Sequence, residues 1–557
     1  MHAWLDKLND HFPLRYSVWI LCAVGLAVSL SLPLMMPMFS AWAWVLPLAF
    51  GALVLLGVRD TRQGTHSVLR NYPVIGHMRY LFEFIRPEIR QYFIEGDNEA
   101  APFSRQQRSL VYQRAKGASD KRPFGTQKDV RAQGYEWINH SVQPTQLPTH
   151  DFRTVIGAAR DGQQGTPCTQ PYSASVFNIS AMSFGALSAN AILSLNAGAK
   201  RGGFAHDTGE GSISRHHRGP DPDGGGDLIW EIGSGYFGCR HADGTFNPEL
   251  FAANAQQRQV KMIEIKLSQG AKPGHGGVLP GPKVTLEIAE ARGVPPLVDC
   301  VSPASHSAFS TPIEMMQFID RLRALSGGKP VGFKLCIGHP WEWFAIAKAM
   351  LATGITPDFI VVDGGEGGTG AAPLEFTDHV GAPLQEGLLL VHNTLVGLNL
   401  RQRIKIGCAG KVVSAFDIAR NMALGADWCN SARGFMFALG CIQAQACHSG
   451  DCPTGVSTQD PHRQKALVVT TKSDRVYNFH QSTLKALKEL VQAAGLDHPG
   501  AITAAHIVRR TNDHEVKLLS NLLPFIKPGS LLAGEMPHSV YRLYWPMAQA
   551  ESFAVAM

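Results

Sequence analysis

The sequence lacks the features that mark several common classes of protein. It has no long run of basic residues, and its net charge is only +6, from 51 Lys and Arg against 45 Asp and Glu. Such a mild excess does not indicate nucleic-acid binding, and no nucleic-acid-binding motif is present. Ten cysteines are few for 557 residues, and they are scattered along the chain. This argues against a scaffold held together by disulfide bonds.

Charged residues are absent altogether from residues 16–58. This run is about twice the roughly 20 residues that cross a bilayer. Pro33, Pro37 and Ser40 interrupt it near its middle. We therefore predict that residues 1–58 form a membrane anchor, a hairpin of two transmembrane helices near 17–35 and 41–58. A signal peptide, the alternative, has a much shorter apolar core followed by a small-residue cleavage site.

Basic residues flank the apolar run on both sides, at Lys7, Arg15, Arg59 and Arg62. The positive-inside rule then places both ends of the hairpin in the cytoplasm. We expect a multi-pass protein of the inner (plasma) membrane with its catalytic domain on the cytoplasmic side. Residues 59–150 are predicted to be a basic linker or accessory segment.

From about residue 175 the chain alternates β-rich runs with helical patterns. Eight such runs end in small or polar residues: 177–183, 203–209, 262–268, 297–303, 330–336, 358–365, 404–410 and 426–434. Eight β/α repeats predict an α/β fold of the TIM (β/α)8 barrel type, whose chemistry lies at the carboxyl ends of the strands. A doubly wound open sheet is the alternative.

Glycine and polar residues concentrate at the predicted strand ends. The ends of the last two strands, GCAGK (407–411) and ARG (432–434), lie where barrels bind a phosphate on backbone N–H groups. A phosphate-bearing cofactor is therefore expected, and FMN fits. Lys266 and Lys334, within the third and fifth predicted strands, are candidates to stabilise negative charge on a reduced flavin. The alternative is that each lysine only snorkels at a strand end.

Gly365, Gly367 and Gly370 match the pattern GxGxxG after a predicted strand. A dinucleotide fingerprint must also open a helix, and the residues after these glycines do not resemble one. We interpret these glycines as permitting close approach to a flat ring.

Three cysteines, Cys441, Cys447 and Cys452, lie in the spacing C-x5-C-x4-C, and Pro453 follows the last of them. Three thiolates at one point suit an iron–sulfur cluster. Because the loop offers no fourth cysteine, a three-iron cluster is the better interpretation. The alternatives are a buried cysteine cluster and a structural zinc site with His448 as the fourth ligand.

Five stretches together resemble the FMN-binding synthase domain of the glutamate synthase family. They are SAMSFGALS, HDTGEGS, EIKLSQGAKPGHGG-LPG, GGTGAAP and GC-x5-CH-x3-CP-x-GV, and the resemblance runs from about 150 to 460. It implies a TIM barrel that holds FMN beside a 3Fe-4S cluster. In that family reduced FMN passes a hydride to 2-iminoglutarate, made from 2-oxoglutarate and ammonia, to give L-glutamate. Electrons reach the flavin through the cluster.

The strand-end pattern and the resemblance together give a set of candidate site residues. The resemblance implies that Lys272 and Arg292 hold the substrate carboxylates, that Glu210 lies by the ring and the substrate, and that Lys266 faces the flavin. The cofactor-binding and metal candidates are Ser183, Gly185, Gln269, Lys334, Gly367, Gly368, Gly407, Gly410 and Gly434 for FMN, and Cys441, Cys447 and Cys452 for the cluster.

The third-strand loop departs from the family pattern KPGEGGQLPG. His275 replaces the glutamate and Val278 replaces a substrate-binding glutamine. Loss of a polar contact in a substrate pocket changes discrimination by a factor of about 10² or more. The expected substrate is therefore the imine of 2-oxoglutarate or of a related α-oxo acid.

We predict a barrel domain over 151–460 and a helical extension over 461–557. No amidotransferase domain, C-terminal β-helix or pyridine-nucleotide module is visible. We expect a membrane-anchored FMN and iron–sulfur oxidoreductase without its own glutaminase. An external donor, a ferredoxin-like protein or a reductase subunit, would supply its electrons. The alternative is an electron-transfer protein that couples membrane redox carriers to a partner and turns over no small substrate.

Overall fold

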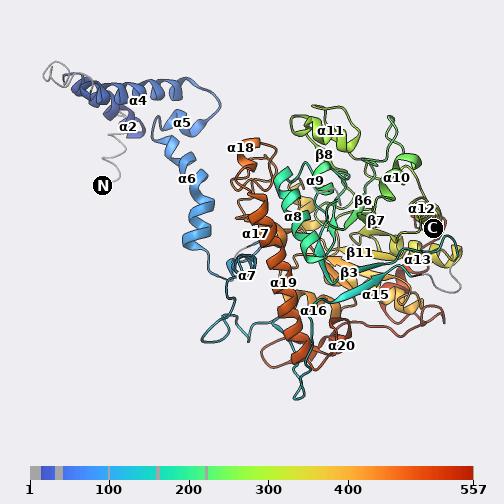
Figure 1. Cartoon of the computed structure of the whole chain (residues 1–557). Coiled ribbons are helices and arrows are strands. Elements are labelled where there is room, and N and C mark those ends of the chain that lie inside the picture. Colours follow the sequence, from blue (N-terminus) through green and yellow to red (C-terminus); the bar gives the residue numbers. More distant parts are fainter. Residues whose placement is uncertain are drawn as a thin grey trace. The chain divides into compact units, whose positions relative to one another are not determined.

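The computed structural model describes residues 14–31, 42–97, 99, 101–158, 164–219 and 224–555 (Figure 1). The chain divides into two units, Met1–Ala100 and Ala101–Met557. The boundary falls inside the predicted accessory segment 59–150, so the two parts of that segment belong to different units.

The first unit is helical. Its elements are η1 (Leu14–Tyr16), α2 (Ser17–Ser29), η3 (Trp42–Trp44), α4 (Val45–Arg62), α5 (Ser67–Asn71), α6 (Gly76–Ile89) and η4 (Arg90–Ile94). Within the described residues, one helix is long and apolar enough to cross a membrane, the 21-residue Trp42–Arg62. The apolar helix α2 is shorter, and the predicted turn at Pro33, Pro37 and Ser40 lies outside the described residues, as does Lys7. The predicted hairpin of two spans is therefore not confirmed.

Helices α2 and α4 pack closely against each other. The Trp19 indole donates a 3.0 Å hydrogen bond to the carbonyl of Val54. A Cβ atom at Gly57 would overlap the Trp19 ring, and one at Gly25 would approach the Phe50 ring to 2.7 Å. Small residues at helix crossings permit this approach, as they do between membrane helices.

The second unit is built on a closed barrel of eight parallel strands, which confirms the predicted fold class. Strand β13 pairs with β4 to close the barrel. In order around the barrel the strands are β4 (Phe177–Ile179), β5 (His206–Asp207), β6 (Leu228–Ile232), β7 (Val260–Lys266), β10 (Val331–Leu335), β11 (Phe359–Asp363), β12 (Lys405–Ala409) and β13 (Trp428–Ser431).

One predicted barrel strand is wrong. In the run 297–303 only β9 (Cys300–Val301) is a strand, and it pairs antiparallel with β8 (Val278–Leu279) in a separate two-stranded sheet. The missing barrel strand is β6, whose five residues are all buried. Leu297 and Val301, in contrast, are 74% and 56% exposed. The run is β-rich, but it lies on an excursion outside the barrel wall.

Helices cover the outside of the barrel. The helices of this unit are α7 (Arg105–Ala115), α8 (Ala189–Gly202), α9 (Arg215–Arg218), α10 (Pro248–Ala255), η5 (Gly281–Lys283), α11 (Leu286–Arg292), α12 (Pro312–Leu325), α13 (Pro340–Thr353), α14 (Leu374–His379), α15 (Leu384–Gly397), α16 (Ala415–Ala423), α17 (Arg433–Leu439), α18 (Pro461–Gln464), α19 (Val469–Ala493), η6 (Pro499–Ala501), α20 (Leu519–Leu522) and α21 (Ser539–Tyr544). The long helix α19 packs along α8, α7, α16 and α17 (Figure 1).

A segment that precedes the barrel in the sequence pairs with one that follows it. Strand β1 (Glu136–Ile138) pairs antiparallel with β14 (Ile507–Arg510), which pairs with β15 (Val516–Leu518). The residues before the predicted barrel start and those of the C-terminal extension thus share one sheet.

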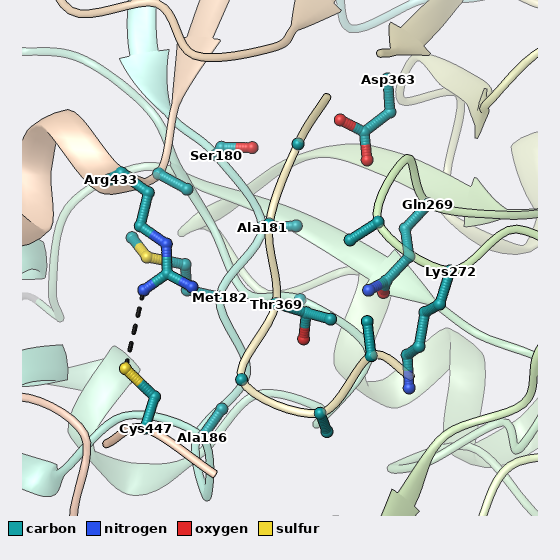
Figure 2. Close-up of a pocket in the computed structure, with 18 of the residues that line it drawn as sticks. Ser180, Ala181, Met182, Ala186, Gln269, Lys272, Asp363, Thr369, Arg433 and Cys447 are labelled. Carbon is teal, nitrogen blue, oxygen red and sulfur yellow. Dashed lines mark hydrogen bonds between the residues drawn. The ribbon is translucent and has the colours of Figure 1, made fainter. Parts of the chain in front are cut away.

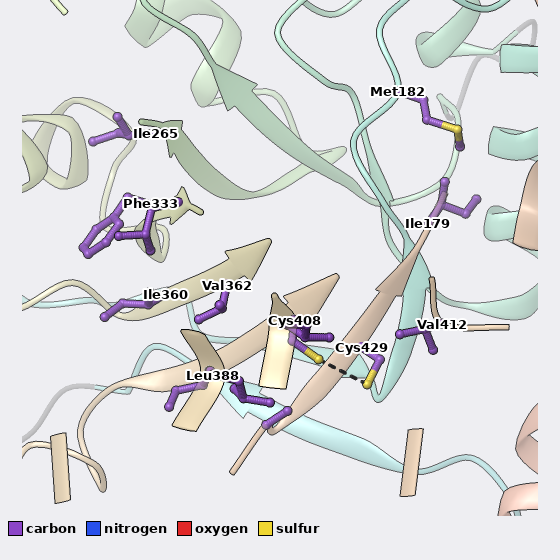
Figure 3. Packing of buried hydrophobic residues seen from close by; sticks show 14 of the residues in the cluster. Ile179, Met182, Ile265, Phe333, Ile360, Val362, Leu388, Cys408, Val412 and Cys429 are labelled. Carbon is purple, nitrogen blue, oxygen red and sulfur yellow. Dashed lines mark hydrogen bonds between the residues drawn. The ribbon is translucent and has the colours of Figure 1, made fainter. Parts of the chain in front are cut away.

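Side chains of the barrel strands alternate between the outer layer and the barrel interior, as the period of two requires. Figure 3 shows the outer layer, where Ile360 and Val362 of β11 and Cys408 of β12 lie near Leu388 of α15. Inside, a smaller apolar cluster fills one end of the barrel. Its members are Ile156, Tyr172, Ala174, Ala205, Ile229, Met262, Phe359, Val361 and Trp428, three of them from the hairpin of β2 (Arg153–Ile156) and β3 (Tyr172–Ser175). The opposite end, at the carboxyl ends of the strands, carries polar side chains.

Candidate active site

A cavity of about 1360 Å³ opens at the carboxyl ends of the barrel strands. Figure 2 shows Arg433 and Cys447 on one side of it, Gln269 and Lys272 on another, and the Thr369 loop between them. Most of the residues proposed from the sequence line this cavity. They are Ser183, Gly185, Glu210, Lys266, Gln269, Lys272, Arg292, Lys334, Gly367, Gly368, Gly410, Gly434, Cys441 and Cys447.

Gly407 and Cys452, the other two proposed residues, are not among those lining the cavity. Gly407 lies in β12, and a Cβ atom there would overlap the ring of Trp428 on the neighbouring strand. Its missing side chain makes room for the barrel's apolar interior. Gly410, three residues on, reaches the cavity.

Glu210 lies among three cationic side chains. Its carboxylate is 3.1 Å from the Lys266 ammonium. Burial alone would raise the pKa of Glu210, but Lys266, with help from Arg292 and Lys272, outweighs burial and lowers it. Glu210 is therefore an ionised carboxylate, and the three cations leave an excess of positive charge for an anionic ligand.

Lys266 is held in place through its backbone. The His306 ring lies 2.9 Å from the Lys266 carbonyl and 3.0 Å from the Tyr236 hydroxyl. Burial lowers the pKa of His306 to about 4, so the ring is neutral and its hydrogen bonds fix its tautomer. His306 therefore helps to position Lys266 at the end of β7.

Arg292, the last residue of α11, reaches the cavity with one donor still free. It donates 3.1 Å to the carbonyl of Phe184, and its guanidinium lies 5.1 Å from the Phe237 ring centre. Among the described residues nothing accepts a hydrogen bond from its buried Nε. A buried guanidinium with an unused donor suits a carboxylate ligand.

Lys334 lines the cavity but lies among carboxyl groups. It forms an ion pair with Glu231 and another, at 3.4 Å, with Glu264. Its ammonium is thus already partnered inside the barrel.

The ends of β12 and β13 carry two cations that were not among the predicted site residues. Lys411 and Arg433 both line the cavity beside Gly410 and Gly434. They lie among the glycine and polar residues expected to bind a phosphate, and a basic residue next to such a loop was the available signal. Beside the backbone N–H groups there, their positive charge suits an anionic ligand.

The glycine loop after β11 runs against the cysteine loop. A Cβ atom at Gly370 would come within 3.2 Å of Cys447, and one at Gly368 within 3.8 Å of Arg433. Helix α14 begins only at Leu374, so the GxGxxG pattern does not open a helix. The glycines let two loops meet at the cavity wall.

Each of the three loop cysteines receives a hydrogen-bond donor. The Gln443 N–H lies 3.5 Å from the Cys441 sulfur, Arg433 lies 3.8 Å from that of Cys447, and the Thr454 hydroxyl 3.4 Å from that of Cys452. Burial opposes ionisation of Cys452, but hydrogen bonds from Thr454 and nearby backbone N–H groups outweigh it and lower its pKa. Donors around sulfur are what a thiolate-bound iron–sulfur cluster requires.

The three loop cysteines and His448 do not form a compact set of ligand atoms in the described residues. A tetrahedral zinc site holds its thiolates about 3.8 Å apart, since each Zn–S bond is about 2.3 Å. Within the described residues, no three ligand atoms of Cys441, Cys447, Cys452 and His448 lie within 4.8 Å of one another. These atoms therefore lie farther apart than the ligands of a tetrahedral zinc site.

The chain matches the family described as a conserved region in glutamate synthase over residues 139–497. It is 38% identical over 500 residues to the glutamate synthase large subunit-like protein YerD of Bacillus subtilis (strain 168), covering 84% of this chain and 94% of that protein. It is 33% identical over 397 residues to the archaeal-type glutamate synthase (NADPH) of Thermotoga sp. (strain RQ2), covering 68% and 74%. The archaeal glutamate synthase (NADPH) of Methanocaldococcus jannaschii is 37% identical over 320 residues, covering 57% and 59%.

Proposed function

The chain belongs to the glutamate synthase family of oxidoreductases, and on this premise we propose that it reduces the imine of an α-oxo acid to an amino acid. FMN would occupy the barrel cavity, and a 3Fe-4S cluster would be held by Cys441, Cys447 and Cys452. One observation carries the proposal. A single cavity is lined by the Glu210–Lys266 pair, by Lys272 and Arg292, and by two of the cluster cysteines.

The charge of the cavity supports an anionic substrate. Lys266, Lys272 and Arg292 face one ionised carboxylate, Glu210. Lys272 and Arg292 would bind the substrate carboxylates by charge-assisted hydrogen bonds. Val278, which lines the cavity and is 46% exposed, offers no polar contact there. We propose 2-oxoglutarate or a related α-oxo acid, with ammonia as the nitrogen source.

The other residues of the cavity would position the cofactor and the imine. When bound, FMN supplies the hydride and the cluster supplies the electrons that restore it. Lys266 keeps Glu210 ionised, and the Glu210 carboxylate would accept a hydrogen bond from the imine nitrogen and orient it. Lys411, Arg433 and the glycine-lined backbone would hold the flavin phosphate.

Electrons would come from a ferredoxin-like protein or a reductase subunit. Support comes from the cysteine loop, where His448, Ser449 and Asp451 are exposed. A partner docking there would approach the cluster closely. The chain would use free ammonia and carry out no glutamine hydrolysis.

We also propose that the protein is anchored in the inner (plasma) membrane with its catalytic unit on the cytoplasmic side. The 21-residue apolar helix Trp42–Arg62 and the glycine-mediated packing of α2 on α4 support an anchor. Arg59 and Arg62 at the end of α4 support a cytoplasmic position for the chain after this helix.

The test is an anaerobic preparation of the whole protein in which flavin and iron are counted and visible and EPR spectra are recorded. The flavin is then reduced and mixed with 2-oxoglutarate or other α-oxo acids plus ammonium. We expect reoxidation of the flavin with formation of the matching amino acid, and loss of both in Lys272→Met. Reoxidation only by a redox protein, with no amino acid formed, would instead identify an electron-transfer protein.

A further inference from the structure

We propose that Asp207, Glu231, Glu264 and Lys334, which we term the carboxyl cluster, store a proton beneath the cavity and pass it through Glu231 to the molecule bound above. The acceptor rests on the proposed function, because reduction of an imine to an amine consumes a proton. The cluster itself rests on the geometry of the barrel interior.

The register of the strands creates the cluster. Glu231 of β6 and Glu264 of β7 are direct cross-strand partners, as are Ile229 and Met262 one step below. Because side chains alternate along a strand, both glutamates point into the barrel, above the apolar layer to which Ile229 and Met262 belong. Asp207 of β5 is the register partner of Ile229, and its carboxylate reaches to within 4.8 Å of those of Glu231 and Glu264.

The cluster is buried and crowded with like charge. Asp207, Glu231 and Glu264 are at most 1% exposed, and their carboxylate oxygens lie within 4.8 Å of one another. The Lys334 ammonium pairs with two of them, Glu231 and Glu264. Three ionised carboxylates beside one ammonium in a dry interior are strongly unfavourable, so the cluster retains at least one proton.

The hydrogen bonds in the cluster are incomplete without that proton. Among the described residues, neither oxygen of Glu264 nor Oδ2 of Asp207 has a hydrogen-bond donor. A carboxylic acid proton between neighbouring carboxyl groups supplies a donor that the protein otherwise lacks. Burial and the neighbouring carboxylates raise the pKa of Asp207 to about 7 and that of Glu264 well above its ordinary value. The stored proton is therefore exchangeable near neutral pH.

Two further charged groups of the described residues lie near the cluster, Asp363 on β11 and Lys266 on β7. On β11, Asp363 accepts a hydrogen bond from the Gly270 N–H at 2.9 Å. On β7, Lys266 at the rim is paired with Glu210. Asp363 adds negative charge and Lys266 is already neutralised, so neither removes the need for a bound proton.

Access to the cluster is one-sided. Glu231 and Lys334 line the cavity, whereas Asp207 and Glu264 lie behind them and do not. The three carboxyl groups resemble a cation site, but the Lys334 ammonium already pairs with two of them, Glu231 and Glu264. A proton is thus the exchangeable species, and it leaves through Glu231.

Proton transfer from the carboxyl cluster to the bound molecule passes through Glu231. Glu231 is ionised beside Lys334 at rest, and it first takes a proton as the O–H bond of Asp207 or Glu264 breaks. The new O–H bond of Glu231 then breaks while that proton bonds to a basic atom of the bound molecule, which restores the Glu231 carboxylate. Water entering the emptied cavity returns one proton to the cluster before the next cycle.

Infrared difference spectroscopy of the whole flavin-loaded protein tests the inference. We expect a carbonyl-stretch band of protonated carboxyl groups at neutral pH that shifts in D2O and is lost in Glu264→Gln and Glu231→Gln. On anaerobic reduction and addition of substrate this band should bleach in the wild type. The matched control is Glu342→Gln on α13, a half-buried carboxyl outside the cavity whose pKa burial also raises. It should leave the cluster band and its bleaching unchanged.

Two results would overturn the inference. The first is an absence of any protonated carboxyl band in wild-type protein at neutral pH, a measurement that needs no variant to fold. The second is a band that stays constant through reduction and substrate addition, as a purely structural cluster requires. In Glu231→Gln we also expect kcat to fall by about 10²–10⁴-fold with KM little changed. Failure of the proposed function would appear differently, as a protein without flavin or iron but with the band intact.

Discussion

At the scale of the residue, Glu210 owes its charge to its neighbours. Burial favours the protonated acid, and the Lys266 ammonium at 3.1 Å reverses that preference. The ionisation of Glu210 therefore depends on the Lys266 ammonium as well as on its own burial.

We expect Lys266→Met to raise the pKa of Glu210, because the largest interaction that lowers it is removed. The acid limb of the pH–rate profile should move to higher pH, and kcat/KM at neutral pH should fall by about 10²-fold or more. Profiles of wild type and variant measured over the same pH range check this. Lys261→Met, which removes a lysine paired with Asp227 away from the cavity, is the control. An unshifted acid limb in Lys266→Met would show that the ionisation of Glu210 does not control the rate at low pH.

Gly407 allows a second test at this scale. A methyl group there overlaps the Trp428 ring, so Gly407→Ala should lower the free energy of unfolding by about 1–3 kcal/mol. Its flavin affinity should stay the same, since Gly407 does not line the cavity. Arg433→Gln should show the reverse, a weaker flavin with little loss of stability. Flavin loss without destabilisation in Gly407→Ala would indicate that Gly407 does help to bind the flavin phosphate.

At the scale of the element, helix α19 binds the barrel through its buried face. The ring of His480 stacks on Phe204 at 3.8 Å between centroids, and its Nε2 lies 3.0 Å from the carbonyl of Phe177. Burial lowers the pKa of this imidazole to about 3. The packing of the helix thus depends on a neutral ring.

This dependence makes the protein sensitive to acid. Between about pH 6.5 and 3 the unfolded chain binds a proton at His480 and the folded chain does not. Stability is therefore present above the unfolded pKa and is lost as pH falls. This one group should lower the free energy of unfolding by about 1.4 kcal/mol per pH unit. Urea unfolding at about pH 7 and pH 5.5 should show a smaller pH dependence in His480→Gln; an equal dependence would contradict the prediction.

Much of the barrel could be predicted from strand runs, and the missed parts have physical causes. The apolar pattern does not predict β6 because Glu231 interrupts it, and the partner of that glutamate, Lys334, lies on another strand. The run 297–303 has strand-like composition, but its apolar side chains are exposed. Local pattern cannot distinguish these cases, since burial depends on the tertiary fold. The cysteine loop was visible from its spacing, whereas the roles of Lys272 and Arg292 were implied by the resemblance to the glutamate synthase family.

At the scale of the whole molecule, the catalytic unit includes residues before the predicted barrel. The Tyr112 hydroxyl donates 2.6 Å to the carbonyl of Cys441, and Gln443 donates 3.2 Å to that of Phe103. The Phe103 and Phe437 rings lie 5.3 Å apart, edge to face. These contacts come from a segment that sequence alone assigned to a linker.

A chain beginning at Ala101 should therefore fold and retain iron and flavin. A chain beginning at 151 lacks α7 and β1, which leaves the cysteine loop uncovered and β14 without its partner β1. We expect it to lose iron, to aggregate, or to melt several degrees lower. Iron and flavin counts with melting curves for the two truncations provide the measurement. Equal cofactor content in both would show that the early segment is dispensable.

The pairing of β1 with β14 also determines the stage of synthesis at which the fold can be completed. Glu136 leaves the ribosome long before its partner Arg509, and the intervening chain carries the whole barrel and all three candidate iron ligands. The early segment must wait, unpaired, until the last tenth of the polypeptide arrives. The barrel and the three candidate iron ligands are therefore all translated before the sheet that holds β1 in place can form.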